Sequence, residues 1–290
     1  MVPGWVGHRQ SAPRRRRRPD GAHGLRAGDA AEVRTALRGA RAALVFMTRV
    51  PVGGFPYSAR EWRWASAWFP LAGLAVGSVC AAAWWLVAPL GPWVAAITVL
   101  VASTLLTGAF HEDGLADTAD ALGGAYDRER IFVILKDSRV GAFGALALAV
   151  SIAFRLVLLA QLGGAAPAAL LLAHCLARVG PVWLMVAMPY VSDAAAKSRQ
   201  VTRAGVPQGV LATVIGVAAT AGVIVAGGSI DATAAFAAFT AMLIATTLCG
   251  WRFHARAGGV TGDFLGAAEQ VNEIVILFTI LAVQVAGVAP

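Results

Sequence analysis

The sequence predicts an all-α fold: a polytopic integral membrane helical bundle of about seven transmembrane helices, with an interfacial helix near its N-terminus. Of the 290 residues, 58% are hydrophobic and only 14% are charged, whereas a soluble domain carries about 25% charged residues. Several segments reach the roughly 20 apolar residues that a helix needs to cross the hydrocarbon core. Helices are expected because lipid offers backbone amides no partners, and the alternating pattern of a β-barrel is absent.

The N-terminal residues 1–35 are predicted to form a disordered, arginine-rich tail, and residues 36–290 a membrane-embedded domain. Residues 1–41 hold ten arginines and three acidic residues, a net charge of +7, and the rest of the chain has a net charge of +1. Such a charge run among prolines and glycines is typical of disorder. Binding to anionic lipid headgroups is favoured over nucleic acid, because no nucleic-acid-binding fold or aromatic pattern accompanies the run.

The membrane segments follow in order after a short apolar stretch, 40–52, whose flanking arginines indicate an interfacial helix. Three helical hairpins are predicted, each closed by a turn of a few residues, and a shorter last span runs almost to the C-terminus. The predicted spans are 65–88, 93–110, 141–162, 165–188, 208–226, 232–250 and 274–288.

The polar segments between the hairpins are expected to lie on the same side of the membrane as the N-terminal tail. Lys and Arg outside the spans then occupy that side, which the positive-inside rule makes cytoplasmic. We therefore expect a multi-pass protein of the cell (inner) membrane whose polar chemistry faces the cytoplasm. Arg155 and Arg178 fall within spans, where ionised side chains usually face a protein interior.

An acidic stretch, HEDGLADTADALGG, begins at His111, directly after a long run without ionised residues. Asp113, Asp117 and Asp120 are spaced i, i+4 and i+7, which places them within an arc of about 60° on one helix face. Carboxylates this close repel one another unless a cation lies between them. Oxygen ligands without His or Cys partners suit Mg²⁺ or Mn²⁺, and Mg²⁺ is commonly completed by water and substrate phosphates.

The alternative for this stretch is a solvated acidic helix face at a membrane exit. The residues between the acids are small or apolar, which favours a packed helix instead. Gly114, Gly123 and Gly124 would also permit a ligand or backbone to approach closely. The sequence therefore predicts Mg²⁺ as cofactor, held by Asp113, Asp117 and Asp120.

Two further polar stretches are candidates for phosphate contacts. KDSRVGAFG contains Lys136, Asp137, Ser138 and Arg139, whose basic side chains suit phosphate oxygens but also fit a positive-inside anchor. The glycine-rich stretch 257–273 can offer backbone amides to phosphate. It lacks a Walker motif, and a simple loop and helix start explains it equally well.

Four blocks together resemble the cobalamin synthase family, also called adenosylcobinamide-GDP ribazoletransferase. The blocks are FMTRVPVG (46–53), HEDGLADTADALGG (111–124), RERIFVILKDSRVGAFGALAL (128–148) and GGVTGDFLGAAEQVNE (258–273). Their order and spacing match the family, and the resemblance covers about residues 36–290, which makes this the predicted transferase domain. The region around 193–203 matches poorly, so no family contacts carry over to it.

The resemblance implies a Mg²⁺-dependent phosphotransferase of the membrane. The ribose 3′-hydroxyl of α-ribazole, or of its 5′-phosphate, would attack the adenosylcobinamide-GDP phosphate nearest the corrinoid. GMP would leave, and adenosylcobalamin or its 5′-phosphate would form. The expected partners are these two substrates, the lipid bilayer and other cobalamin-assembly enzymes, with no nucleic acid.

Residue roles in this chemistry follow from charge and position. Metal-bound carboxylates would hold the diphosphate, Lys136 and Arg139 would stabilise the GMP leaving group, and a carboxylate or His111 would accept the hydroxyl proton. The predicted catalytic residues are His111, Asp113, Asp117, Lys136 and Arg139. The predicted substrate-binding residues are Asp120, Gly123, Gly124, Asp137, Ser138, Thr261, Asp263 and Glu269.

Two other functions stay open on the sequence alone. A CDP-alcohol phosphotransferase also uses a membrane-embedded acidic helix, but its usual Ala-Arg pair after Asp-Gly is replaced here by Leu115-Ala116. An ion-coupled secondary transporter would place its acids near the bilayer midplane, often within inverted repeats. Here the acids lie at a span end, and no internal repeat is visible.

Overall fold

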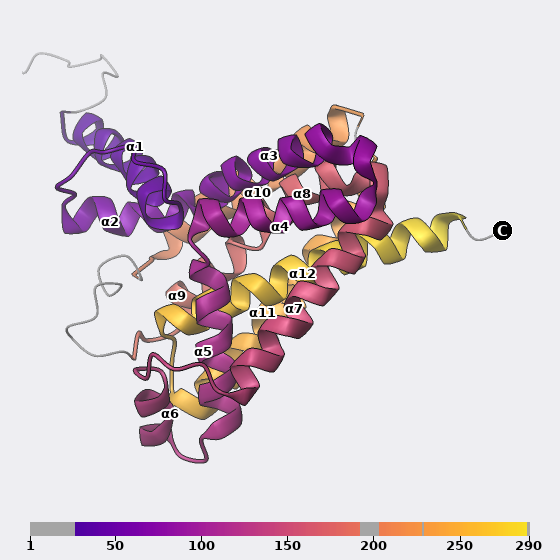
Figure 1. The fold of residues 1–290 in the computed structure, drawn as a ribbon. Coiled ribbons are helices and arrows are strands. Elements are labelled where there is room, and N and C mark those ends of the chain that lie inside the picture. The colour runs from indigo at the N-terminus through magenta and orange to yellow at the C-terminus, as the bar shows by residue number, and fades with distance from the viewer. Residues whose placement is uncertain (1–26, 192–202, 228, 289–290) are drawn as a thin grey trace, which may run out of the picture.

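The computed structural model describes residues 27–191, 203–227 and 229–288, which form an assembly of helices without strands (Figure 1). This confirms the all-α prediction. The predicted tail up to residue 26 lies outside the described residues, and α1 begins at Ala27, before the predicted boundary. The helices are α1 (Ala27–Met47), α2 (Ala59–Ala65), α3 (Phe69–Val87), α4 (Pro92–Thr107), α5 (Phe110–Gly124), α6 (Arg128–Ile134), α7 (Ala142–Leu162), α8 (Ala166–Leu176), α9 (Val179–Ala187), α10 (Val206–Val225), α11 (Ala232–Ala257) and α12 (Gly262–Val288).

The membrane class is confirmed, but the count of seven spans is not. Five segments are long and apolar enough to cross a bilayer, and α4 with α5 makes a sixth if this bent pair counts as one span. The predicted spans 141–162 and 165–188 fall into one apolar run of 46 residues, which a 3-10 turn at Gly163–Ala165 interrupts. The five segments are Ala59–Leu90, Ala142–Ala187, Val206–Val225, Ala232–Ala257 and Gly262–Gly287.

The last helix begins much earlier than the sequence predicts. We expected a span over 274–288 after a polar segment, whereas α12 is a single helix of 27 residues. Its first half holds Glu269, Gln270, Asn272 and Glu273, each at most 3% exposed. These polar groups lower the hydropathy of the segment, but other helices bury them and pair Glu269, Asn272 and Glu273, so the helix continues through them.

The two ends of the bundle differ in character. Helices α1, α2 and α6 lie at one end, whereas the turns that follow α3, α7 and α10 lie at the other, near the C-terminus (Figure 1). This arrangement agrees with the predicted placement of polar connections on one side. We call the end that carries α1, α2 and α6 the polar end.

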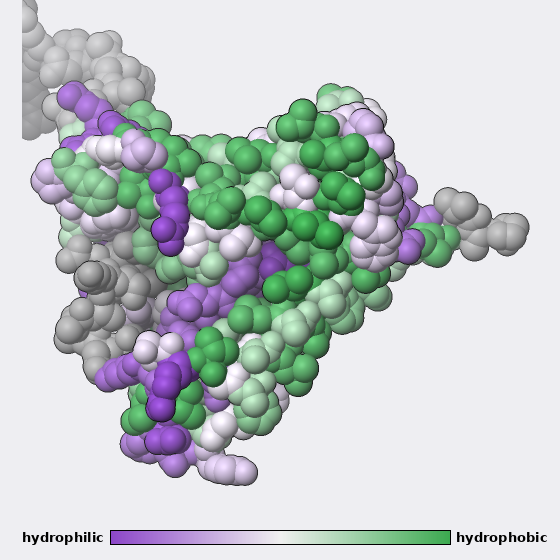
Figure 2. Space-filling view, in the orientation of Figure 1, coloured by the Kyte–Doolittle hydropathy of each residue, from purple (hydrophilic) through white to green (hydrophobic). Residues whose placement is uncertain are grey.

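The surface supports immersion in lipid. Large apolar side chains are widely exposed, for example Leu86 at 82% and Phe236 at 74%, which is unfavourable in water but suits a hydrocarbon environment. Figure 2 shows hydrophobic surface over two layers of helices, with a hydrophilic strip running between the layers. The polar chemistry of the protein is therefore concentrated between the layers and at the polar end.

A sharp elbow redirects the chain from α4 into α5. The two helices are bent by 90° across their break. Gly108 (φ 72°) ends α4 by donating its N–H to the Thr104 carbonyl. Ala109 (φ 58°) has the same left-handed backbone conformation, which residues other than Gly and Asn seldom adopt. The elbow places the acidic helix α5 across the interior, where it packs along α12.

Candidate active site

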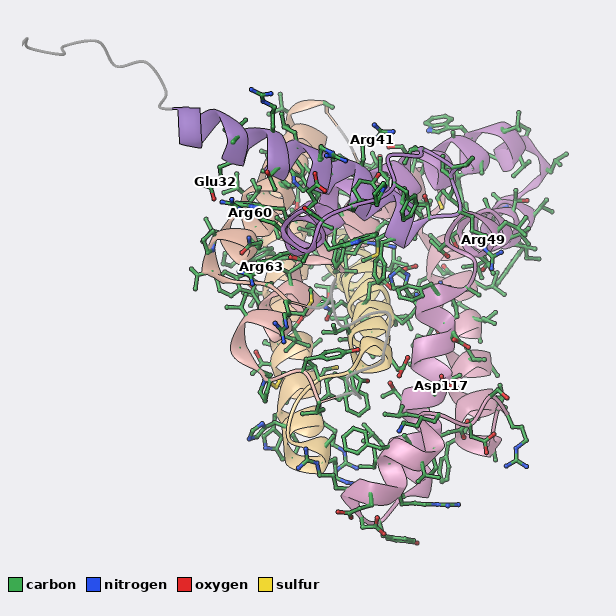
Figure 3. The ribbon with its side chains drawn as sticks, turned by 90° about the vertical axis from the view of Figure 1, so that its left-hand side faces the viewer. Glu32, Arg41, Arg49, Arg60, Arg63 and Asp117 are labelled. Atoms are coloured by element: carbon green, nitrogen blue, oxygen red, sulfur yellow. The ribbon has the colours of Figure 1, made fainter. Side chains whose placement is uncertain are left out.

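The predicted aspartates all lie on α5, but their environments differ. Asp113 is exposed, Asp117 is half-buried and Asp120 is buried. Figure 3, which views the molecule from the polar end, shows Asp117 on the side of α5 that faces the centre of the molecule. The helix packs along α12, as favoured over a solvated acidic face, and the roles of its aspartates stay predictions.

Asp120 does not resemble a metal ligand, because its carboxylate already binds backbone. One oxygen accepts the Gly141 N–H at 2.7 Å and the other accepts the Gly144 N–H at 2.9 Å. These amides belong to the first turn of α7, where backbone donors lack partners within the helix. A side chain on either glycine would collide with the Asp120 carboxylate. Asp120 therefore caps the start of α7 and joins it to α5, in place of the predicted metal role.

Asp263 takes the place beside Asp113 and Asp117. It lies in the first turn of α12, and its backbone packs directly on Gly114, where an added Cβ would stand 2.9 Å from the Asp263 carbonyl oxygen. Gly114 directly follows Asp113 and lies three positions before Asp117. Its close contact with Asp263 therefore brings α12 beside both aspartates of α5. The charge of Asp117 is repelled by those of Asp113, Asp263 and Asp120, and no basic side chain of the described residues offsets this repulsion.

Thr261 and Glu269, both predicted to bind substrate, have structural partners instead. The Thr261 side chain is 2% exposed, and its hydroxyl accepts the Phe264 N–H at 3.2 Å, so it caps the start of α12. Glu269 lies deeper and pairs with Arg178 at 2.9 Å. Neither side chain faces open solvent.

A buried network of ion pairs links α5, α7, α8 and α12 behind the aspartates. Arg155 contacts Glu112 at 3.1 Å and Glu273 at 3.6 Å, while His174 lies 3.5 Å from Glu273. Arg155 and Arg178 are each 2% exposed, which confirms that both face the protein interior. Within a bilayer such charges persist only when they are paired, so the network fixes how these four helices meet.

His111 belongs to this buried network and not to the exposed part of the site. Its Nδ1 lies 3.8 Å from a Glu269 oxygen, and the residue is 4% exposed. It lines a cavity of about 30 Å³ together with apolar side chains of α1, α3 and α5, which is room for about one water molecule. The geometry therefore gives a carboxylate of α5 or α12 better access to a substrate hydroxyl than His111.

The basic stretch before α7 is arranged as a local ion pair. Arg139 is exposed and donates to both Asp137 oxygens, at 2.9 and 2.6 Å, and its backbone N–H also bonds Asp137. These hydrogen bonds lower the pKa of Asp137 to about 2. Lys136 and Ser138 are exposed in the same loop, so contact of this loop with a leaving group stays a prediction.

The C-terminal end of α5 is bound by a basic side chain that the sequence did not indicate. Gly123 and Gly124 lie at this exposed end, with Gly123 against the Phe143 ring. Arg256, from α11, donates to the Leu122 carbonyl at 3.3 Å and to the Ala125 carbonyl at 2.6 Å. A cation at a helix C-terminus is favourable, so Arg256 holds the end of the acidic helix.

Two sets of side chains qualify as metal ligands by residue type. Ligand atoms of His174, Glu269 and Glu273 lie within 4.8 Å of one another. Among the described residues, these three form the group of His, Cys, Asp or Glu side chains that is close enough to share one metal ion. Arg155 and Arg178 already neutralise that set. The aspartates Asp113, Asp117 and Asp263 do not come within that distance of one another, but none of them forms an ion pair with a basic side chain that the structure describes, and carboxylate oxygens suit Mg²⁺.

The fold and the site together define a helical, multi-pass membrane protein with a carboxylate-rich site at the polar end of its bundle. The family model described as "Cobalamin-5-phosphate synthase" matches residues 39–281. The chain therefore belongs to the cobalamin-5-phosphate synthase family, as its four sequence blocks predicted. This membership favours the predicted transferase over a CDP-alcohol phosphotransferase or a transporter.

Several relatives carry the name adenosylcobinamide-GDP ribazoletransferase. One from Leptothrix cholodnii is 43% identical over 244 residues, which cover 80% of this chain and 90% of that protein. One from Polaromonas sp. is 38% identical over 260 residues, covering 80% and 92%, and one from Ralstonia nicotianae is 36% identical over 259 residues, covering 87% and 98%. No solved structure matches the chain.

Proposed function

We propose that this protein joins α-ribazole, or α-ribazole 5′-phosphate, to adenosylcobinamide-GDP with release of GMP. The ribose 3′-hydroxyl forms the new P–O bond at the phosphate nearest the corrinoid, and the bond between that phosphate and GMP breaks. The hydroxyl proton passes to a protein carboxylate. Family membership and the names of the relatives support the reaction.

The observation that carries the proposal is the meeting of α5 and α12 at Gly114. At this contact the charges of Asp113, Asp117 and Asp263 act on one another, and no basic side chain in the described ranges offsets the repulsion on Asp117. A diphosphate would add more negative charge to this site, so a cation is needed for the two to coexist. A neutral or cationic substrate would not need this arrangement.

We propose Mg²⁺ as the cation, held by Asp113, Asp117 and Asp263. When bound, Mg²⁺ would neutralise charge on the diphosphate oxygens during transfer. The protein supplies position: the Asp120 cap fixes α5 against α7, and the Thr261 cap fixes the first turn of α12. Of the three proposed ligands, Asp113 is the most exposed, which makes it the best placed of them to accept the hydroxyl proton.

We further propose that the site faces the cytoplasm of an inner-membrane protein. The basic loops lie at the polar end together with the aspartates, and the positive-inside rule assigns that end to the cytoplasm. Both nucleotide substrates would then reach the site without crossing the bilayer. Association with other cobalamin-assembly enzymes stays a prediction.

The proposal is tested by incubating purified protein in phosphatidylcholine vesicles with adenosylcobinamide-GDP, α-ribazole 5′-phosphate and Mg²⁺. We expect GMP and the phosphorylated cobalamin in equal amounts. Replacing the donor by a CDP-activated alcohol should give no CMP. Release of CMP, or ion-driven uptake of substrate without release of any nucleotide, would assign the protein to a different activity.

A further inference from the structure

A second pocket opens at the polar end, apart from the aspartates. It has a volume of about 320 Å³, within the range of about 300–1,000 Å³ that is usual for small-molecule sites. Its lining comes from α2, from α9 and the residues after it, and from the residues directly before α10. The lining residues are Arg63, Met185, Met188, Tyr190, Arg203, Ala204 and Gly205.

The charge of this pocket is opposite to that of the aspartate site. Arg63 and Arg203 are its charged lining residues, both are exposed, and neither has an acidic partner in the part of the chain that the structure describes. Gly205 is the N-cap of α10, a helix of 20 residues, whose N-terminus adds positive potential. The pocket therefore combines two guanidinium groups with a helix start, which suits a phosphate group.

The chain connects this pocket directly to the aspartate site. Tyr190, in the pocket wall, forms a parallel bridge with Val260, through hydrogen bonds from Val191 N–H to the Val260 carbonyl at 2.9 Å and from Val260 N–H to the Pro189 carbonyl at 3.0 Å. Val260 directly precedes the Thr261 cap of α12, which carries Asp263. In Figure 3, Arg63 and Asp117 lie on opposite sides of the central region. The bridge therefore joins the pocket wall to the segment that leads into the helix of Asp263.

The arginine on α2 is held by a well-defined helix. Ser58 and Glu61 form a capping box at its start, and the buried Glu61 pairs with Arg38 of α1 at 2.9 Å. The Trp68 indole N–H, just beyond α2, donates to the Ala36 carbonyl at 2.8 Å. These contacts fix the orientation of α2, so Arg63 is presented by a rigid element.

We propose that this pocket binds the phosphate monoester of the acceptor nucleotide, the 5′-phosphate of α-ribazole 5′-phosphate. This inference rests on the proposed function. A diphosphate needs the cation-binding aspartates, whereas a phosphate monoester is recognised by arginines alone. Separate binding of the two anions leaves the 3′-hydroxyl of the same ribose free to face the aspartates.

The test compares two acceptors, α-ribazole 5′-phosphate and α-ribazole, in Arg63→Gln and Arg203→Gln. Loss of one charged hydrogen-bonding group should lower the ratio of kcat/KM for the phosphorylated over the unphosphorylated acceptor by about tenfold or more, through a higher KM for the phosphorylated one. Arg60→Gln is the matched control, because Arg60 lies on the same helix and pairs with Glu32 at 3.1 Å. It should leave the ratio unchanged.

Three results would overturn the pocket assignment. The first is an equal effect of the variants on both acceptors. The second is an effect that appears only in vesicles containing phosphatidylglycerol and not in phosphatidylcholine, which would assign the arginines to a lipid headgroup. The third is binding of α-ribazole 5′-phosphate to purified protein, measured by calorimetry, that Arg63→Gln does not weaken. If a glutamine variant aggregates, the matching lysine variant replaces it, and a partial loss of selectivity is expected.

Failure of the proposed function gives a different pattern. In that case the wild-type protein releases no GMP with either acceptor. The calorimetric comparison does not depend on turnover, so it still decides whether the pocket binds a phosphate monoester.

Discussion

Asp120 occupies the space that a side chain at Gly144 would fill, and it accepts the Gly144 N–H at 2.9 Å. The pair joins the acidic helix to the start of α7, and it explains two glycines of the GAFG segment by contact with one carboxylate. It also separates the role of Asp120 from those of the other aspartates of α5.

Asp120→Asn should therefore reduce stability more than metal dependence. One oxygen acceptor is replaced by an amide donor that faces a backbone N–H, and a hydrogen bond to a charged group contributes about 1.5–3 kcal/mol. We expect a lower midpoint of thermal unfolding in detergent, with an unchanged Mg²⁺ concentration for half-maximal activity in the fraction that stays folded. A shift of that Mg²⁺ concentration would restore Asp120 to the metal site.

Gly114→Ala should impair activity by displacing Asp263. The added Cβ would stand 2.9 Å from the Asp263 carbonyl oxygen, so α12 must move away from α5. We expect at least a tenfold loss of kcat, since small displacements of positioning groups are costly. Gly222→Ala, in α10 with open space around its Cα, is the matched control and should retain full turnover. Equal activity of both variants would show that the α5–α12 contact does not position the site.

The buried pair of Arg178 and Glu269 should be stabilising only as a pair. Arg178→Met leaves an unpaired carboxylate inside the bundle, which typically costs about 3–5 kcal/mol. The double variant Arg178→Met with Glu269→Leu should recover most of that loss in thermal unfolding. If the double variant is as unstable as Arg178→Met, the pair does not account for the stability of this region.

The exposed pair of Asp137 and Arg139 should persist at every pH at which the enzyme works. The folded pKa of Asp137 is lowered to about 2 from an ordinary 3.8, so the contribution of this pair to stability is present above about pH 4 and is lost as the pH falls through 2. Asp137→Asn should therefore leave the shape of the activity profile between pH 5 and 9 unchanged. A shift in the acidic limb of that profile would show that Asp137 titrates in the working range.

The sequence predicted the membrane class and the helix that carries Asp113 and Asp117 because both depend on local patterns: apolar run length and i, i+4 spacing. It did not predict the role of Asp120, since the amides that bind it lie more than twenty positions along the chain. Asp263 was predicted to bind substrate and not to lie beside Asp113, because only the packing of its backbone on Gly114 brings the two helices together. The early start of α12 was missed because buried pairing of Glu269 and Glu273 offsets their polarity.

The pocket around Arg63 and Arg203 likewise could not be predicted from local sequence patterns. Arg63 precedes the first predicted span, 65–88, and Arg203 lies at the end of the region in which the family resemblance is weak, so neither stood in a recognisable motif. Their joint presence depends on how α10 packs against Ser66–Trp68, the turn that directly follows α2. Local sequence patterns do not reveal such a contact between distant segments.

The most direct measurement is the Mg²⁺ dependence of GMP release by Asp117→Asn and Asp263→Asn beside the wild-type protein. Substitution of a ligand that stabilises developing charge commonly lowers kcat by about 100-fold or more. We predict a loss of that size in both variants, with a higher Mg²⁺ concentration needed for half-maximal rate and no activity in EDTA for any of the three proteins. Wild-type turnover that persists in EDTA, or unchanged Mg²⁺ dependence in both variants, would contradict the proposed role of these aspartates.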